Sequence, residues 1–323
     1  MNKGKCWDLY DLIERDERRN KIMISLQTAN NALKDIYLDV IANQINCNTD
    51  VLLGKIKRTS SDVWGKEIIK NVWINGKMLT LKEELKNFYV SMEISDKAIR
   101  CSQNSAGAFV NLINDEVEYM MKEAQHRLRN SFYTEDTKPD YLPEDFKYQP
   151  MEITGLKKIF DIKSKTLYGL SRKENPEMNP VIKTLDKFDP IKIQEIIDNN
   201  NDEVNVIVCS AKVKRDYMQY MSEHRQNIEV IECDGGFKCL QFNNSLLMAQ
   251  AKIPDNEIYL LNTEDFTLHQ LCDWKWLGDE NGNVLKQVVG KPAYKATIVK
   301  YADYICEKPY KQIKIVIGEN NDN

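Results

Sequence analysis

Residues 105–132 read SAGAFVNLINDEVEYMMKEAQHRLRNSF, a stretch without proline. Its apolar residues recur at the spacing of one face of an α-helix, with acidic residues nearer the start and basic residues nearer the end. They are Phe109, Val110, Ile113, Val117, Met120, Met121, Ala124 and Leu128. A helix of this length would span roughly 42 Å at about 1.5 Å per residue. The pattern alone is compatible with a core helix of a large α+β domain and with the backbone of an elongated subunit.

The composition limits the possible classes of protein. The chain has 323 residues, of which 42% are hydrophobic and 29% are charged, so it can fill the core of one large domain or two ordinary ones. Its 45 basic side chains are outnumbered by 49 acidic ones, which gives a net charge of −4. A protein that coats nucleic acid usually has a basic balance, so the composition argues against that class. It is compatible with a container that encloses nucleic acid without gripping it.

Targeting and metal-binding patterns are not found in the sequence. No apolar run is long enough to cross a membrane, and the start, MNKGKCWDLYDLIERDERRNK, lacks the apolar core of a signal peptide. The eight cysteines include no CxxC pair, and the three histidines lie far apart. The spacing therefore predicts no zinc site. We expect reduced thiols in a protein made in a cytosol.

Two segments precede the long helix. Residues 8–47 have helical patterns, which predict either an N-terminal helix on the domain's own core or an arm on a neighbouring molecule. Residues 59–94 have strand-like composition, and Asn75-Gly76 is a strong hairpin-turn signal. We expect a long two-stranded hairpin that lies on its own subunit or on the next, because isolated hairpins are marginal in water. Deleting residues 66–86 is expected to leave the subunit folded and to block assembly.

The chain after the helix changes character several times. TEDTKPDYLPEDFKYQP predicts a surface connection, and MEITGLKKIFD and KTLYGLSR are strand candidates. Residues 182–255 combine helical stretches, the apolar strand NVIVCSA and a hairpin-like pair around DGGF, which predicts a compact mixed α/β unit. In residues 256–318, LHQLCDWKWL and AYKATIVKYADYI alternate apolar and polar residues, as half-buried antiparallel strands do.

No stretch carries a recognisable catalytic or cofactor motif. NVIVCSAKVKRDY lacks the glycines that wrap a phosphate. Cys209 would need a paired histidine to act as a nucleophile, and neither His224 nor His269 has a motif around it, so we expect a small buried residue there. Trp274 and Trp276 would share one face of a strand. The acidic pairs expected on solvated hairpins or turns are Glu83 and Glu84, Glu264 and Asp265, and Asp279 and Glu280.

We therefore expect no catalytic, cofactor-binding or metal site, and a structural assembly protein rather than an enzyme. A cytosolic α/β enzyme remains an alternative at this point.

Three stretches resemble the major capsid proteins of tailed bacteriophages, in a form common in phages and prophages of low-GC Gram-positive bacteria. The first joins DVWGKEIIKNVWINGK to LKNFYVSMEISDKAIRCSQNSAGAFVNLINDEVEYMMKEAQ and is similar to the family's extended loop and spine helix. The second comprises MEITGLKKIFD and TLYGLSRKENPEMNP, and the third comprises EIYLLNTEDFTLHQLCDWKWL and GKPAYKATIVKYADYICEKP. The resemblance covers about residues 28–318.

The resemblance implies an α+β fold, the tailed-phage major capsid fold, with an inserted axial domain. The implied parts are an N-terminal arm (1–58), an extended β-hairpin loop (59–94), a peripheral domain (95–181 and 256–318) with its spine helix at about 105–132, an axial domain (182–255) and a polar tail (319–323).

The resemblance also implies partners. Subunits would self-assemble as hexamers and pentamers into an icosahedral shell that encloses double-stranded DNA without sequence-specific binding, and a portal protein would join it. Because the family-like region starts near residue 28, we expect a separate scaffolding protein rather than a built-in one. The shell would belong to the virion and be made and assembled in the cytoplasm of the host bacterium. An encapsulin-like nanocompartment, which can share the fold, is the alternative.

In such a shell, extended loops would lie across neighbouring subunits and axial loops would approach the capsomer axis. The candidate intersubunit contacts are Lys66, Lys70, Trp73, Lys77, Glu83, Glu84, Asp234, Gly235 and Gly236.

Overall fold

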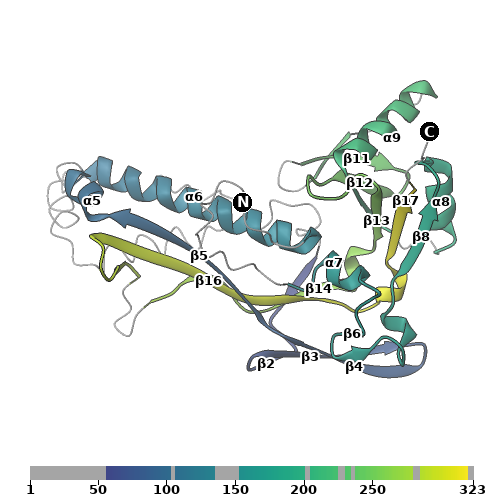
Figure 1. Cartoon of the computed structure of the whole chain (residues 1–323), viewed down its shortest axis with the longest axis horizontal. Coiled ribbons are helices and arrows are strands. Elements are labelled where there is room, and N and C mark those ends of the chain that lie inside the picture. Colours follow the sequence, from purple (N-terminus) through teal and green to yellow (C-terminus); the bar gives the residue numbers. More distant parts are fainter. Residues whose placement is uncertain are drawn as a thin grey trace. The chain divides into compact units, whose positions relative to one another are not determined.

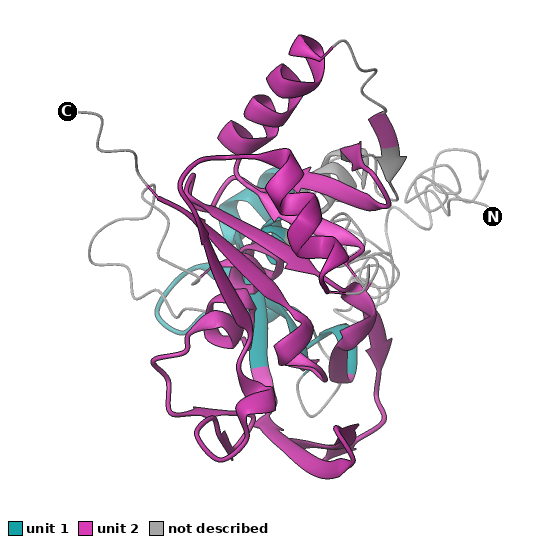
Figure 2. Ribbon diagram, turned by 90° about the vertical axis from the view of Figure 1, so that its right-hand side faces the viewer, with its two compact units in different colours: residues 1–46, 87–126, 272–301 teal, residues 47–86, 127–271, 302–323 magenta. Residues whose placement is uncertain are grey.

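A computed structural model describes residues 56–102, 106–134, 153–200, 204–224, 230–233, 237–278 and 284–318. The chain divides into two compact units, each built from separate stretches (Figure 2). Unit 1 takes in residues 1–46, 87–126 and 272–301, and unit 2 takes in residues 47–86, 127–271 and 302–323. Three elements labelled in Figure 1 have residues in both units: the helix α6 (Ala106–Tyr133) and the strands β14 (Phe266–Trp276) and β16 (Ala293–Cys306). The predicted N-terminal arm lies outside the described residues except for its last three.

The described helices are α5 (Asp96–Ser102), α6 (Ala106–Tyr133), α7 (Leu156–Phe160), α8 (Pro190–Asp198) and α9 (Ala211–Glu223), with 3-10 turns η1 (Pro176–Met178), η2 (Thr263–Asp265) and η3 (Pro309–Lys311). The first strands are β1 (Lys57–Thr59), β2 (Val63–Trp64), β3 (Glu67–Ile74), β4 (Lys77–Glu84), β5 (Lys86–Ser95), β6 (Thr166–Leu167), β7 (Leu170–Ser171) and β8 (Val181–Leu185). The later strands are β9 (Val206–Cys209), β10 (Val230–Cys233), β11 (Phe237–Phe242), β12 (Ser245–Ala249), β13 (Glu257–Leu261), β14 (Phe266–Trp276), β15 (Lys286–Gln287), β16 (Ala293–Cys306) and β17 (Ile313–Ile317).

The long helix α6 has nearly the bounds that its periodicity predicts, residues 105–132. The side chains of Val117, Met120, Ala124, Leu128 and Phe132 are all at most 2% exposed, and their spacing of three and four places them on one face. In unit 2, Phe132 packs edge-to-face against the rings of β14 Phe266 and β16 Tyr304, with ring centroids 6.0 and 4.8 Å apart. The C-terminal end of this helix therefore packs on β14 and β16.

Unit 1 packs aromatic and aliphatic residues between strands. Along β5, buried and exposed residues alternate, as they do in a strand with one face in a core, and β5 pairs with β16. The ring of Phe88 in β5 lies 6.5 Å from Trp274 of β14 in an edge-to-face arrangement. Their spacing predicts that the two tryptophans share one face, and both are buried, since Trp276 is 8% and Trp274 5% exposed.

Unit 2 contains a seven-stranded sheet in the order β10-β11-β12-β9-β13-β17-β8. The continuous apolar run VIVC forms its buried central strand β9. The neighbours of β9 are β12, which is parallel to it, and β13, which is antiparallel. Because β13 and β17 are members, the sheet extends beyond residues 182–255, the stretch predicted for the axial domain. The domain limits themselves stay a prediction.

The two faces of this sheet are covered differently. The helices α8 and α9 share one hydrophobic cluster with the face that carries Ile207, Leu247 and Ile258. Asp189 caps α8 by accepting hydrogen bonds from two backbone N–H groups of its first turn, with Pro190 at the position where a missing N–H costs nothing. On the opposite face, Tyr259 of β13 packs edge-to-face against Phe160 of α7, with ring centroids 5.1 Å apart.

The two strand candidates that follow α6 in the sequence fold differently. MEITGLKKIFD is not a strand: it contains the helix α7, whose buried residues Leu156, Ile159 and Phe160 follow a spacing of three and one. KTLYGLSR does form strands, the short hairpin of β6 and β7. Tyr168 and Gly169 form its turn with positive φ angles of 51° and 74°, as expected for a tight hairpin turn.

Candidate assembly surface

The hairpin predicted from Asn75-Gly76 is present. β3 and β4 pair antiparallel over their whole length, and β2 adds a third strand. Asn75 and Gly76 both have positive φ, 50° and 77°, which is the backbone that this dipeptide favours in two-residue turns. The hairpin ends at Glu84, and the following NFYVSMEI belongs to β5, which pairs with β16 instead. The predicted excursion over residues 59–94 is therefore shorter, because its last strand lies in another sheet.

The inner face of this three-stranded sheet is buried within the subunit. Its apolar residues are Ile68, Val72, Ile74, Leu79 and Leu81, and each is at most 6% exposed. Backbone hydrogen bonds also hold the hairpin: Lys82 N–H donates to Tyr168 O at 3.0 Å, and Leu85 N–H donates to Lys66 O at 2.9 Å. Burial of such side chains contributes about 1.5–3 kcal/mol each. The expectation that residues 66–86 are dispensable for folding is therefore wrong, because they supply part of the core.

The outer face carries large apolar side chains in solvent. Trp64 and Trp73 are each 70% exposed and Met78 is 56% exposed. The register places all three on one side, because Trp73 is paired with Met78 and Trp64 is paired with Glu67, which lies on the same side of β3 as Trp73. We call these three residues the outer apolar face. Trp64 and Met78 were not among the sequence candidates, although their place in the strand alternation identifies them.

The charged candidates fall into two groups. Lys66 and Glu84 form an ion pair 3.5 Å apart, with side chains 80% and 60% exposed, at the rim of the outer face. Lys70 is half-buried and bridges Asp62 at 3.1 Å and Glu307 at 3.7 Å. Burial alone would lower the pKa of Lys70, but the hydrogen bond to Asp62 and the charges of both carboxylates raise it.

Two further candidates also contact their own subunit. The Lys77 ammonium donates to the Asn175 side-chain oxygen at 2.8 Å, and Glu83 pairs with Lys86 at 3.0 Å. Lys70, Lys77 and Glu83 thus hold the hairpin to the subunit, and Lys66, Trp73 and Glu84 are the candidates that face outward. The intersubunit role of all six stays a prediction.

The candidates Asp234, Gly235 and Gly236 lie outside the described residues. The strands on either side of them, β10 and β11, pair antiparallel up to Cys233 and Phe237. The hairpin-like pair predicted around DGGF is therefore present.

Of the groups considered for catalysis, Cys209 and His269 lie in the core, whereas His224 is exposed at the end of α9. Cys209 is fully buried, and burial raises the pKa of its thiol to about 12, so it is a protonated thiol at neutral pH. His269 is also fully buried, with Nδ1 3.0 Å from Ser61 O. Asp265, expected on a solvated turn, is instead 4% exposed and pairs with Lys308 at 3.0 Å. Asp279 and Glu280 lie outside the described residues.

The described part of the chain has neither a metal-binding cluster nor a membrane-spanning helix. No group of His, Cys, Asp and Glu there could hold a metal ion. No helix there is long and apolar enough to cross a membrane.

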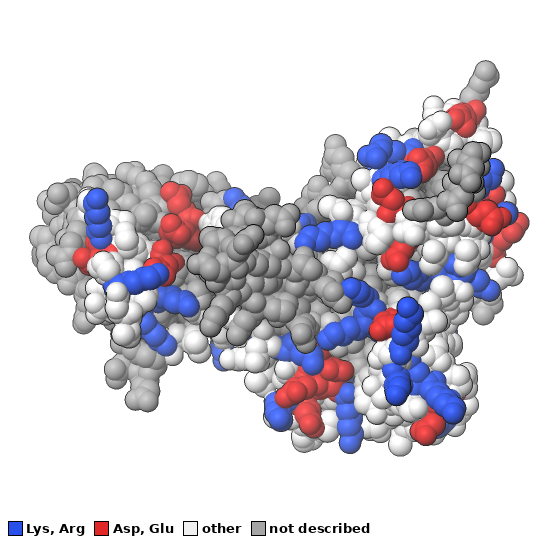
Figure 3. Space-filling model, viewed as in Figure 1, with Lys and Arg blue, Asp and Glu red and all other residues white. Residues whose placement is uncertain are grey.

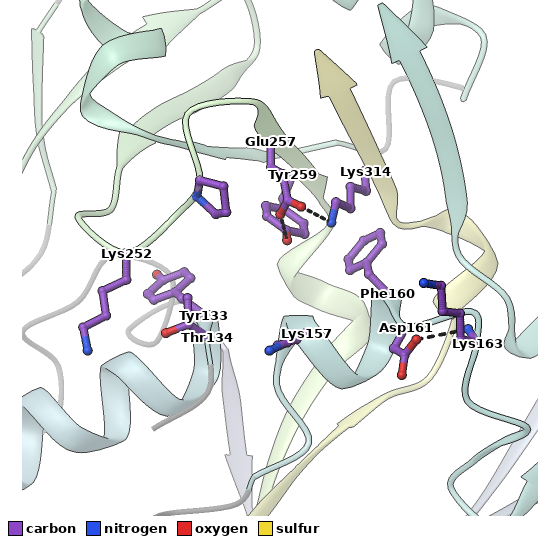
Figure 4. Close-up of a pocket in the computed structure, with 11 residues that line it drawn as sticks. Tyr133, Thr134, Lys157, Phe160, Asp161, Lys163, Lys252, Glu257, Tyr259 and Lys314 are labelled. Atoms are coloured by element: carbon purple, nitrogen blue, oxygen red, sulfur yellow. Dashed lines mark hydrogen bonds and ion pairs between the residues drawn. The ribbon is translucent and has the colours of Figure 1, made fainter. Parts of the chain in front are cut away.

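Unit 2 also contains a hollow of about 530 Å³ that the sequence did not predict (Figure 4). It lies on the side of the seven-stranded sheet where Tyr259 meets Phe160. Its lining residues are Tyr133, Thr134, Lys157, Phe160, Asp161, Lys163, Lys252, Pro254, Glu257, Tyr259 and Lys314. They come from the end of α6, from α7 and its following turn, from the turn after β12, and from β13 and β17.

Sequence comparison and structure comparison give different results. No protein-family model and no curated protein matches the sequence. Among solved structures, the capsid of cyanophage A-1(L) matches with a TM-score of 0.58 at 10% identity, over 83% of this chain and 91% of that one. The SrpI encapsulin of Synechococcus elongatus PCC 7942 matches with a TM-score of 0.55 at 10% identity, over 84% and 89%. The capsid of an empty GTA particle matches with a TM-score of 0.53 at 10% identity, over 84% and 90%.

The chain has the tailed-phage major capsid fold. The assignment of α6 as the spine helix and of β2, β3 and β4 as the extended loop stays a prediction. The α+β class expected from the sequence is confirmed. At such low identity the likeness shows the fold alone, so the function of the chain is a proposal.

Proposed function

We propose that this chain is the major capsid protein of a tailed phage. It self-assembles as hexamers and pentamers into an icosahedral shell that encloses the double-stranded DNA genome. The observation that carries the proposal is the end-to-end match to shell subunits: the cyanophage capsid chain is covered over 91% of its length and this chain over 83%. The assignment to a phage or prophage of a low-GC Gram-positive host rests on the sequence resemblance alone.

The outer apolar face supports an assembling subunit. Two tryptophans and a methionine in solvent on one side of a small sheet are unusual for a monomer, and such patches mark interaction sites. Tryptophan is also enriched among the residues that dominate interface energies. We propose that this face of the extended loop, with the Lys66–Glu84 pair at its rim, contacts a neighbouring subunit. Lys70, Lys77, Glu83 and the segment Asp234, Gly235, Gly236 remain secondary candidates for intersubunit contact.

The charge distribution supports a shell that encloses DNA without binding it tightly. The net charge is −4, and on the face drawn in Figure 3 Lys and Arg are interspersed with Asp and Glu. Because non-specific DNA binding grows with the number of phosphates that Lys and Arg neutralise, such a surface would bind packed DNA weakly. The proposal therefore includes no sequence-specific DNA contact, no cofactor and no enzymatic activity.

We further propose a portal protein and a separate scaffolding protein as partners, with assembly in the cytoplasm of the host bacterium and the finished shell in the virion. An encapsulin-like nanocompartment is the second candidate function. It is favoured by the match to the SrpI encapsulin, whose TM-score of 0.55 and coverage are close to those of the cyanophage capsid.

Electron microscopy of the full chain, expressed alone and together with the products of neighbouring genes, tests the proposal. We expect closed or tubular particles with hexameric and pentameric capsomers. A chain that remains a monomer or dimer under all these conditions would contradict shell formation. Particles that hold nuclease-protected DNA beside portal and terminase genes indicate a phage capsid. Particles that fill with a protein cargo in the absence of such genes indicate the nanocompartment.

A further inference from the structure

The hollow in unit 2 is surrounded by lysines from four separate elements. Lys157 lies on α7, Lys163 follows α7, Lys252 lies in the turn after β12, and Lys314 lies on β17. Figure 4 shows them around the cavity rather than on one side of it, with Lys252 and Lys163 far apart and Lys157 between them. A ligand in the hollow would therefore meet positive charge at several separate points.

The carboxylates of the lining only partly offset this charge. The two acidic residues are Asp161 and Glu257. Both oxygens of Glu257 are engaged, because one accepts from the Lys314 ammonium and the other from the Tyr259 hydroxyl, each at 2.5 Å. Glu257 thus fixes Lys314 and Tyr259 in place and cannot also neutralise the lysines across the hollow.

Two of the lysines are exposed and available. Lys163 and Lys252 are both exposed to solvent, and within the described part of the chain neither ammonium has an ion-pair partner. They are on opposite sides of the cavity in Figure 4. Among the residues that the structure describes, an anionic ligand would have no existing partner to displace from these two ammonium groups.

The aromatic residues of the lining do not offer a stacking surface. Tyr133, Phe160 and Tyr259 are at most 5% exposed, and Phe160 and Tyr259 pack edge-to-face against each other. Recognition of nucleotides in single strands uses exposed ring faces on which bases stack. The buried rings therefore form a packed floor, and the part of the hollow that a ligand meets is mainly charge.

The type of the basic residues around the hollow indicates which class of anionic ligand suits it. The basic residues of the lining are all lysines, so the hollow offers no bidentate arginine fork that would fix a single phosphate group. Lysine ammoniums are separate point charges on flexible stems, which suits several carboxylates spaced along a chain. We propose that the hollow is a docking site for an extended acidic peptide segment of another protein molecule. This proposal goes beyond shell formation and does not depend on it.

Fluorescence anisotropy of a fluorescein-labelled decaglutamate peptide with the full chain tests the site. The variant Lys163→Glu/Lys252→Glu reverses the two available charges. The control Lys183→Glu/Lys192→Glu makes the same change in net charge at exposed lysines of β8 and α8, away from the hollow. We expect saturable binding that the first variant weakens about tenfold and the control changes by less than about twofold. Because the contacts are solvent-exposed ion pairs, about 0.5 M NaCl should abolish binding.

A further double variant and two competitors sharpen the test. Lys163→Gln/Lys252→Gln removes the charges without reversing them and should give an intermediate loss, which guards against misfolding of the reversed variant. Equal weakening by both charge-reversal variants, or no saturation up to about 1 mM peptide, would overturn the proposal. Displacement of the peptide by tripolyphosphate or a short DNA duplex at lower concentrations than by unlabelled decaglutamate would overturn the assignment to acidic peptides.

Discussion

Asp303 of β16 accepts two hydrogen bonds from Thr154, one from the backbone N–H at 2.7 Å and one from the hydroxyl at 3.0 Å. Asp303 is fully buried, and Thr154 lies immediately before Gly155 and α7. The carboxylate therefore fixes the segment that leads into α7 against the long strand. Its pKa is raised to about 7, mainly because burial disfavours the charged form. The charge of Glu83 also raises the pKa, and the hydrogen bonds from Thr154 and Tyr304 and the charge of Lys86 oppose the rise without cancelling it.

The first prediction concerns the pH dependence of stability. In the unfolded chain Asp303 titrates near 3.8, whereas in the folded chain it titrates near 7. The folded state thus holds the proton more strongly, and the stabilisation is complete below about pH 4 and is lost as the pH rises through about 7. Each pKa unit corresponds to about 1.4 kcal/mol, so the loss amounts to a few kcal/mol. Urea unfolding of Asp303→Asn should show a smaller loss of stability between pH 5 and 8 than the natural chain.

The exposed Asp255 gives the control for this measurement. Asp255→Asn should keep the pH dependence of the natural chain. If Asp303→Asn also keeps it, the Asp303 carboxylate does not titrate in this range and the prediction fails.

The second prediction concerns the contact between Gly155 and the end of α6. A Cβ atom at Gly155 would lie 2.3 Å from Phe132 O, a backbone atom that cannot move aside easily. Gly155→Ala should therefore lower the free energy of unfolding by about 1–3 kcal/mol, as other overpacked sites do. At Gly318 the nearest atom would be at 3.7 Å, an ordinary contact, so Gly318→Ala is the matched control. Equal denaturation midpoints for the two variants would contradict the close approach.

The sequence predicted the elements whose local signals were strong. The periodicity of residues 105–132 gave α6, Asn75-Gly76 gave the hairpin turn, and the apolar run VIVC gave a central strand. It did not predict where the hairpin ends, because KMLTLKEELKNFYVSMEIS keeps a strand-like pattern through Leu85, where the chain passes from β4 to β5. Nor did it predict α7, which has too few residues for its periodicity to stand out.

The candidate surfaces, like the fold, could be predicted from the sequence only in part. Trp73 could be picked from its place beside the turn, but its exposure depends on which face of the sheet is buried, and that is set by packing. The hollow could not be predicted, because Lys163, Lys252 and Lys314 are far apart in the sequence. The order of strands in the seven-stranded sheet brings β12 and β17 into one sheet, and Phe160 of α7 packs against Tyr259 of β13 on one of its faces.

The third prediction separates the two faces of the hairpin. Trp73→Ala removes an exposed side chain and should change the unfolding free energy by less than about 0.5 kcal/mol, while sharply reducing the fraction of protein in assembled particles. Leu81→Ala removes a fully buried side chain and should cost about 2–5 kcal/mol of subunit stability. Ile191→Ala, at an exposed position of α8, is the control for assembly. If Trp73→Ala assembles as well as Ile191→Ala, the outer apolar face is not an assembly contact.

The fourth prediction concerns His269. The shift in its pKa makes the stability change with pH in the direction opposite to the change that Asp303 causes. Burial lowers the pKa of His269 below 6.5, although the hydrogen bond to Ser61 O and the charge of Asp62 oppose this effect. On acidification His269 therefore binds a proton near pH 6.5 in the unfolded chain but only at lower pH in the folded chain. The contribution of His269 to stability is thus present above pH 6.5 and is lost as the pH falls. Acidification from pH 7.5 to 5 thus destabilises the subunit through His269 and stabilises it through Asp303.

His269→Gln should make the subunit gain more stability on acidification than the natural chain, whereas Asp303→Asn should make it gain less. Urea unfolding of both variants at the two pH values checks this, and changes of the same sign in both would show that the two groups do not oppose each other.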